Sequence, residues 1–431
     1  MAAANIEEQA PLVATDSEIL HHAALDARMV KSVRDIKLLG MVSWPMEVQH
    51  DFLARWERGD ASLPVVEYPA FDFSQTRREL AAIVEEADPS HPLGHYVIES
   101  ALSWSLAAEL LEAIGTPRVT DFSIRLFGHP DAPLPGNGPT TYEAAQHFID
   151  IADELDRELL APSEQVSISA TALQLQLQSD LDAFFNGRVI DVVLDPRLIA
   201  KAAAGATRIR LRSGAEFSDY DRHQLLEHEA FVHSLTALNG REQPLLPSLA
   251  LSSPRTTATQ EGLATFAEQI TGRIDIERMK RVSLRIEAVA MALSGADFVD
   301  VFRYFLDAGQ VPAESFASAQ RVFRGVPLTG GSAFTKDTVY LRGLIAVHTF
   351  FRRALRQRKL HQCRHLFAGK MTLADARHFE PLFASGVLLP PRWLPQWVAR
   401  ANGLAGMLAF SLFANRIRLD QVESEQSLLK I

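Results

Sequence analysis

Apolar residues recur every three to four positions over most of the chain, and this spacing predicts amphipathic helices. In the first third, helical spacing covers 16–58 with a break at Pro45, and it returns at 75–86, 99–114 and 140–160. The stretches 61–73 and 128–139 are dense in helix breakers and predict loops. Beyond position 218 nearly everything is helical, with predicted helices at 219–238, 255–271, 274–293, 296–308, 312–324, 336–357 and 372–386.

The middle of the chain has a different pattern, because three short β-branched or alternating runs predict strands at 166–169, 189–194 and 207–212. In the third run Ile209 and Leu211 alternate with arginines, so the arginines should share the opposite face of the sheet. A small mixed sheet followed by a helical body predicts an α+β fold that is mainly helical. We expect four regions along the chain: a flexible N-terminus (1–20), a helical region (21–160), a catalytic domain (161–400) and a helical C-terminal extension (401–431).

The helix after the arginine-rich strand contains the segment His228-Glu229-Ala-Phe-Val-His233. Two imidazoles with a carboxylate beside them are typical of zinc hydrolases, in which the spacing His-Glu-x-x-His places both rings on one helix face. Here one residue is added, and on a regular α-helix the two rings would diverge by roughly 140°. We therefore predict a local π-bulge between the histidines. The alternative is that His233 is a hydrogen-bonded core histidine and Glu229 a surface acid.

A third ligand is expected from the next helix, where Glu261 is followed by Gly262 and lies 28 residues after His233. Small neighbours let the Glu261 helix approach another helix closely. The residues thus predict Zn²⁺ bound by His228, His233 and Glu261, with Glu229 as the general base. Thr257 or Thr259 is expected to cap this helix.

Together, His228-Glu-Ala-Phe-Val-His233 and Gln260-Glu-Gly-Leu-Ala264 resemble the bacterial QEGLA-motif proteins, which are named for an effect on flavohaemoglobin expression. These are related to the microtubule-associated tyrosine carboxypeptidases. Further matches lie at 239–244, 321–325 and 334–343, and the resemblance covers roughly 160–400. It implies a zincin-like metallopeptidase that acts on the C-terminus of a peptide or protein. It also implies ligands at His228, His233 and Glu261 and catalysis by Glu229, but activity on tubulin is not carried over.

A carboxypeptidase needs a cation for the terminal carboxylate of its substrate, and Arg321, Arg324 and Lys336 are the candidates. Tyr340 is a candidate donor to the developing oxyanion. Arg210 lies on the strand 207–212, which is expected to bind substrate backbone if it forms a sheet edge. The alternatives are that the cations are ordinary surface residues and that the strand has a solvated face.

The composition and charge of the chain indicate its cellular compartment and the kinds of partner to expect. The formal charge of −10 argues against a nucleic-acid partner, and the single cysteine, Cys363, indicates a reducing compartment. No basic, apolar leader is visible, and the apolar stretch 403–414 is too short to span a bilayer, so we expect a buried helix there, a cytoplasmic location and no membrane partner. The oligomeric state is not predicted. The competing function is a regulatory, partner-binding protein whose zinc is structural or absent; Glu229 favours the enzyme, because a structural site needs no base.

Overall fold

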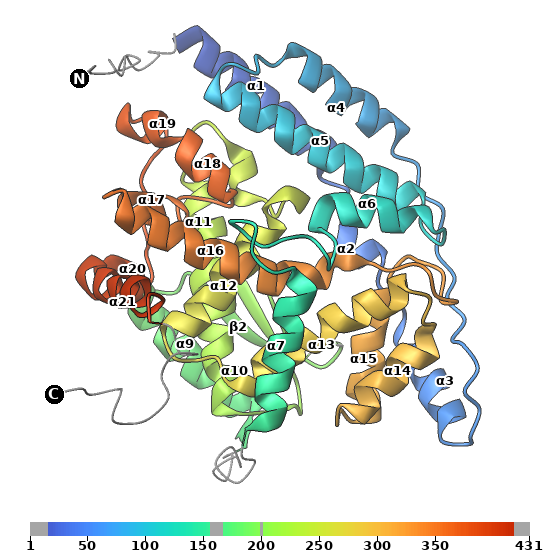
Figure 1. Cartoon of the computed structure of the whole chain (residues 1–431). Coiled ribbons are helices and arrows are strands. Elements are labelled where there is room, and N and C mark those ends of the chain that lie inside the picture. The colour runs from blue at the N-terminus through green and yellow to red at the C-terminus, as the bar shows by residue number, and fades with distance from the viewer. Residues whose placement is uncertain (1–15, 156–166, 199–200, 418–431) are drawn as a thin grey trace, which may run out of the picture.

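The computed structural model describes residues 16–155, 167–198 and 201–417 (Figure 1). The first helices are α1 (Asp16–Val33), α2 (Leu38–Met41), α3 (Met46–Trp56), α4 (Ser74–Glu86), α5 (Pro92–Glu112), α6 (Arg118–Phe127) and α7 (Thr141–Glu154). The middle contains β1 (Ile168–Ser169), α9 (Ala170–Phe185), β2 (Asp191–Asp195), β3 (Ala202–Ala204), β4 (Arg208–Arg212) and β5 (Glu216–Phe217).

The helical body begins with α10 (Asp219–Gln224), the π-helix η1 (Leu225–Ser234), α11 (Leu235–Arg241) and the short turns η2 (Pro247–Ala250) and η3 (Pro254–Thr256). It continues with α12 (Thr257–Ile270), α13 (Ile276–Leu293), α14 (Phe298–Asp307), α15 (Pro312–Phe323), η4 (Thr335–Thr338) and α16 (Val339–Arg356). The last helices are α17 (His361–His365), α18 (Leu373–His378), α19 (Glu380–Ala384), α20 (Gln396–Ala399) and α21 (Ala401–Ala414).

Most predicted helices are confirmed, but α6, α9 and the short helices α17 and α20 were not predicted. In α9 the leucines alternate with glutamines, which hides the helical period. Leu173, Leu177 and Leu181 recur every four residues and are buried, whereas Leu175 is exposed. Helix α5 begins earlier than predicted, because Pro92 occupies its first turn and His91 accepts a hydrogen bond from the amide of Leu93.

The strands form two small sheets. Strand β4 lies between β2, to which it is parallel, and β3, to which it is antiparallel, while β1 and β5 pair in a second sheet. Ile209 and Leu211 are buried and the arginines of β4 face solvent, which confirms the predicted alternation. The short strands β3 and β5 were not predicted.

The helices surround one continuous core. Figure 1 shows α1, α4 and α5 side by side at one end, and α3, α14 and α15 together at another. Helix α12 crosses α16 near the middle, and a single hydrophobic cluster extends from Ile19 to Leu408. The predicted region boundary at 160 and the terminal segments 1–15 and 418–431 lie outside the described residues.

One expectation about the C-terminal helix is wrong. Only Leu404 and Leu408 of α21 are buried, and Phe410 and Phe413 are exposed, so this helix packs on the surface by one side alone. Within the described ranges, no helix combines the length and the apolar character that crossing a membrane requires.

Candidate metal centre

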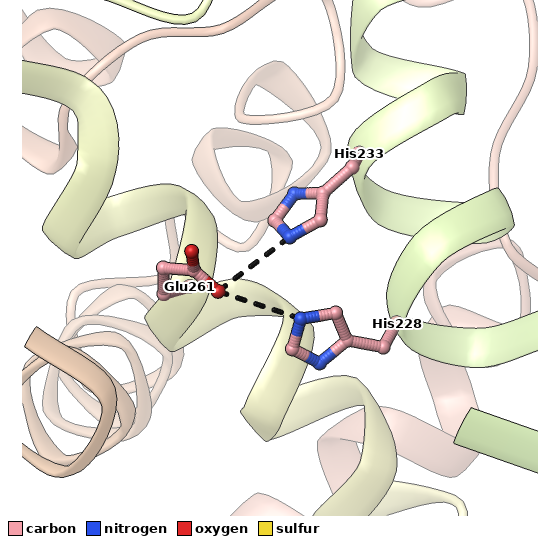
Figure 2. A group of neighbouring side chains, drawn as sticks. All are labelled: His228, His233 and Glu261. Atoms are coloured by element: carbon pink, nitrogen blue, oxygen red, sulfur yellow. Dashed lines mark ion pairs between the residues drawn. The ribbon is translucent and has the colours of Figure 1, made fainter. Parts of the chain in front are cut away.

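The two histidines come from η1, a ten-residue π-helix that joins α10 to α11. Because a π-helix closes each turn with an i to i+5 bond, His228 and His233 lie one above the other on the same face. Their ring centroids are 4.9 Å apart, and Figure 2 shows both rings extending from one helix towards α12. The predicted distortion between the histidines is confirmed, although it spans the whole segment rather than one residue.

Glu261 of α12 faces both rings. Its Oε2 atom lies 3.4 Å from His228 Nε2 and 3.7 Å from His233 Nε2 (Figure 2). Two ligand atoms on a tetrahedral zinc ion are separated by about 3.3 Å, since each lies about 2 Å from the metal. One donor atom from each residue lies within 4.8 Å of the others, and this is the only such group of three among the described residues. The donor chemistry and the spacing therefore suit Zn²⁺.

The approach of Glu261 depends on a contact between two glycines. A Cβ atom on Gly262 would lie 2.2 Å from the carbonyl carbon of Gly343 in α16, so only glycine permits this crossing. The expected close helix approach is thus confirmed, and α16 is the neighbour. The predicted caps are wrong, because the N-cap of α12 is Thr256, whose hydroxyl donates to the carbonyl of Ser253 instead.

A buried carboxylate orients the first histidine. Glu268, two turns after Glu261 on α12, is fully buried, and its Oε1 atom lies 2.6 Å from His228 Nδ1. Arg278 donates two hydrogen bonds to the same carboxylate. Burial alone would raise the pKa of Glu268, but hydrogen bonds from His228 and Arg278 lower it to about 2. Glu268 therefore holds the Nδ1 proton and leaves Nε2 facing Glu261. The sequence analysis missed this residue, although its seven-residue spacing from Glu261 was visible.

Glu229 follows His228 on η1, is partly exposed and has no hydrogen-bond partner within the described part of the chain. Burial lowers the pKa of the His228 imidazole, but hydrogen bonds to Glu261 and Glu268 raise it, and the charge of Glu229 adds to this rise. The geometry leaves Glu229 free to accept a proton, and its role as the base stays a prediction.

Two of the predicted substrate-binding cations already have carboxylate partners. Lys336 Nζ donates to Glu261 Oε1 at 2.7 Å and to the Tyr340 hydroxyl at 2.9 Å. Arg321 binds both oxygens of Asp337, at 2.8 and 2.5 Å. Although burial opposes it, the charge of Lys336 and the hydrogen bonds from the histidines hold the pKa of Glu261 well below its usual range. Lys336 thus links Glu261 to Tyr340, and Arg321 in turn donates to the same Tyr340 hydroxyl at 3.4 Å.

Arg324 and Arg285 differ from these cations, because neither has a carboxylate partner in the described residues. The Nε atom of each is buried without a hydrogen bond, while both side chains keep partial exposure. Burial, and then the charge of Arg321, lowers the pKa of each guanidinium to about 10. These are unneutralised cations beside the Arg321–Asp337 pair, and Arg285 was not predicted.

Lys370 is a third unpaired cation near the site, and it was also missed. Its ammonium donates to the Ser252 hydroxyl at 2.7 Å, and no described carboxylate forms an ion pair with it. Burial lowers the pKa of Lys370 to about 8, against the attraction of Glu229 and Glu261. Asn239 and Gln243 hold its loop by donating to the carbonyls of Phe367 and Ala368. The last turn of α11 and the residues just after it therefore position the loop that carries Lys370.

The proposed role of Arg210 in strand addition is contradicted. Strand β4 is the central strand of its sheet, so both of its hydrogen-bonding edges are occupied. Arg210 instead lies on the solvated face, 3.4 Å from an oxygen of Asp195.

Comparison with known proteins places this site in a family. The family model for microtubule-associated tyrosine carboxypeptidase matches residues 50–416, which include every residue of the metal centre. A search of curated proteins gives no match. The mainly helical fold with small mixed sheets agrees with the zincin-like peptidases of this family, as predicted. The chain belongs to the microtubule-associated tyrosine carboxypeptidase family.

Proposed function

We propose that this protein is a zinc-dependent metallocarboxypeptidase that removes C-terminal residues from a peptide or protein. The observation that carries the proposal is the convergence of His228, His233 and Glu261 at tetrahedral ligand spacing, with Glu229 free beside them. Family membership supports the same reaction class.

The three converging residues would hold the ion through His228 Nε2, His233 Nε2 and Glu261 Oε2. Bound Zn²⁺ would act as a Lewis acid that polarises the scissile carbonyl and acidifies water. Glu229 takes a proton from the attacking water and passes it to the leaving amine. Tyr340 accepts a hydrogen bond from Lys336, which directs its own proton outward, towards the carbonyl oxygen that becomes negative.

Arg324 and Arg285 supply the site for the substrate's terminal carboxylate. A buried guanidinium without a carboxylate is costly, and a bidentate carboxylate from the substrate satisfies it. Arg321 and Lys336 are less suited to this role, since their hydrogen bonds already go to Asp337 and Glu261. Arg324 thus keeps its predicted role and Arg285 is added to it.

Three further proposals rest on sequence alone. The segment Gln260–Ala264 supports membership of the bacterial QEGLA-motif branch. The single cysteine supports a cytoplasmic location, and the net negative charge supports the absence of a nucleic-acid partner.

The test combines metal analysis with release of the last residue from peptides that carry a free or an amidated C-terminus. We expect one zinc per chain and release only from the free acid. Glu229→Gln should keep zinc and lose about 10²–10⁴-fold in kcat. His228→Ala should lose the zinc.

Arg285→Gln and Arg324→Gln should raise KM for the free-acid peptide, whereas Arg353→Gln, at an exposed position of α16, should not. Equal activity of wild type and Glu229→Gln would exclude the proposed base. A zinc-loaded wild type that releases nothing would favour the partner-binding alternative.

A further inference from the structure

Helix α21 has an apolar face that nothing in the described chain covers. Met407, Phe410, Phe413 and, just beyond the helix, Ile417 are 46%, 73%, 62% and 53% exposed. Their spacing of three and four residues places them on one stripe, opposite the buried Leu404 and Leu408. We call this stripe the α21 face.

The α21 face is unusual within this molecule. The chain has 24 phenylalanines, all within the described ranges, and only Phe410 and Phe413 are exposed. No charged residue occurs anywhere in α21. A surface helix normally turns polar side chains to water, so an uncharged helix with an exposed aromatic stripe indicates a surface that becomes covered.

The part of the chain that carries this face is rich in positive charge. Residues 338–417 contain twelve lysines and arginines but only two acids, a formal charge of +10 in a chain whose total is −10. Arg400 precedes α21 and Arg416 follows it, and both are exposed. Arg364 lines a groove with Leu404 at the start of the helix, and at the other end the amide of Asn415 lies within hydrogen-bond distance of Arg352.

The helix that supports α21 adds to the same charge. Helix α16 packs against α21, as the neighbouring ends of these helices in Figure 1 indicate, and its last turns expose Arg353 and Arg356. The α21 face is thus an apolar strip with cations at both ends, on a helix packed against another whose last turns carry two more.

We propose that the α21 face docks on an anionic lipid surface, with Phe410 and Phe413 inserted at the headgroup boundary and the flanking arginines on lipid phosphates. An apolar helix face with basic neighbours is the combination that interfacial binding requires. A second copy of this chain fits less well, because packing α21 on α21 brings two sets of arginines together. The proposal replaces the expectation that the protein has no membrane partner, which considered only an apolar leader or a membrane-spanning stretch and took the helix at 403–414 to be buried.

The experiment is cosedimentation of the full chain with phosphatidylcholine vesicles, with and without phosphatidylglycerol. Wild type should bind the anionic vesicles, lose this binding at high salt, and bind pure phosphatidylcholine at least about tenfold more weakly. Phe410→Ser/Phe413→Ser should weaken binding to anionic vesicles by at least about tenfold. Arg353→Gln/Arg356→Gln should weaken it only where phosphatidylglycerol is present.

The matched control is Leu175→Ser/Val65→Ser, which removes two side chains of similar exposure from other surfaces and should bind as wild type does. All variants change exposed residues, and their thermal midpoints verify folding. Absence of wild-type binding to anionic vesicles would overturn the proposal, as would unchanged binding of the phenylalanine variant. A dimer in solution that this variant dissociates, without vesicle binding, would show that a second copy covers the face. Binding to an acidic polypeptide but not to vesicles would equally overturn it.

Discussion

A carboxylate oxygen of Glu268 lies 2.6 Å from Nδ1 of His228, and Glu268 is held there by Arg278. The same helix, α12, thus supplies Glu261 to one nitrogen of the His228 ring and Glu268 to the other. One rigid element fixes both a ligand and the orientation of its neighbour.

Glu268→Gln should therefore weaken zinc binding without removing a ligand. The amide keeps a hydrogen bond but loses the charge that fixes the Nδ1 proton, so zinc affinity should fall about 10–100-fold. Competition with a chromophoric chelator measures the affinity. Glu277→Gln, at an exposed acid of α13, is the control and should match wild type. Unchanged affinity in Glu268→Gln would show that Glu268 serves only the fold.

Gly262→Ala should damage both the fold and the metal site. Replacement of a helical glycine by alanine normally stabilises a helix by up to about 1 kcal/mol. Here the new Cβ would meet the Gly343 backbone at 2.2 Å, so α12 must move and the free energy of unfolding should fall by about 1–3 kcal/mol. Zinc affinity should fall with it, because Glu261 moves too. Gly406→Ala in α21, where a Cβ meets nothing within 4 Å, should cost no stability.

Asp26 should make the stability of the protein depend on pH. This side chain of α1 is fully buried with one unpaired oxygen, and burial raises its pKa to about 6 despite a hydrogen bond from the Ser248 amide. Because the folded state holds the proton more tightly than the unfolded state, the free energy of unfolding should decrease as pH rises from about 4 to 6. Asp26→Asn should remove this dependence and add about 1–3 kcal/mol at pH 7.5.

Denaturant unfolding at several pH values measures the effect of Asp26. Asp35→Asn, at a side chain that is 83% exposed, should leave the curve unchanged. A wild-type curve that is flat between pH 4 and 6 would contradict the expected contribution.

Lys370 should cause kcat/KM to fall at alkaline pH. Its buried ammonium is charged below about pH 8 and is attracted by Glu229 and Glu261, so it favours the negative charge that the substrate brings into the site. Wild-type kcat/KM should fall above pH 8. Lys370→Met should lower kcat/KM about tenfold at pH 7 and lose this alkaline fall. Lys31→Met, at an exposed residue of α1, should behave as wild type, and a variant profile that keeps the alkaline limb would exclude Lys370 as its source.

The residues that the sequence predicted at this site are those with a local signal. His228, Glu229 and His233 share one helical turn, and Glu261 is adjacent to a glycine that marks a close helix crossing. Even the distorted helix was predictable, because a step of five residues from one histidine to the other does not return to the same face of a regular α-helix.

The residues that were missed reach the site through tertiary structure. The position of Lys370 depends on a loop held by Asn239 and Gln243. The lack of a hydrogen-bond partner at Arg285 becomes visible only when α13, α15 and α16 are packed together. The position of β4 inside its sheet was equally hidden, since the pairing of distant strands decides which strand forms an edge. The alternation of apolar residues and arginines in β4 predicted which face of the strand is exposed, but not that β2 and β3 lie on either side of it.

In this metal site the number of residues between His228 and His233 and the π-helical geometry of η1 depend on each other. If one residue were deleted between His228 and His233, the sequence would read as the commoner four-step motif, yet the wide turn would then carry the second imidazole away from Glu261. If η1 instead became a regular α-helix with the present sequence, the two imidazole rings would also separate, because a step of five residues does not return to the same face of an α-helix. A change in the residue spacing alone, or in the helix geometry alone, would separate the ligands. Lineages with the five-residue spacing should therefore keep the π-helix, and conversion between the two motifs requires both changes at once.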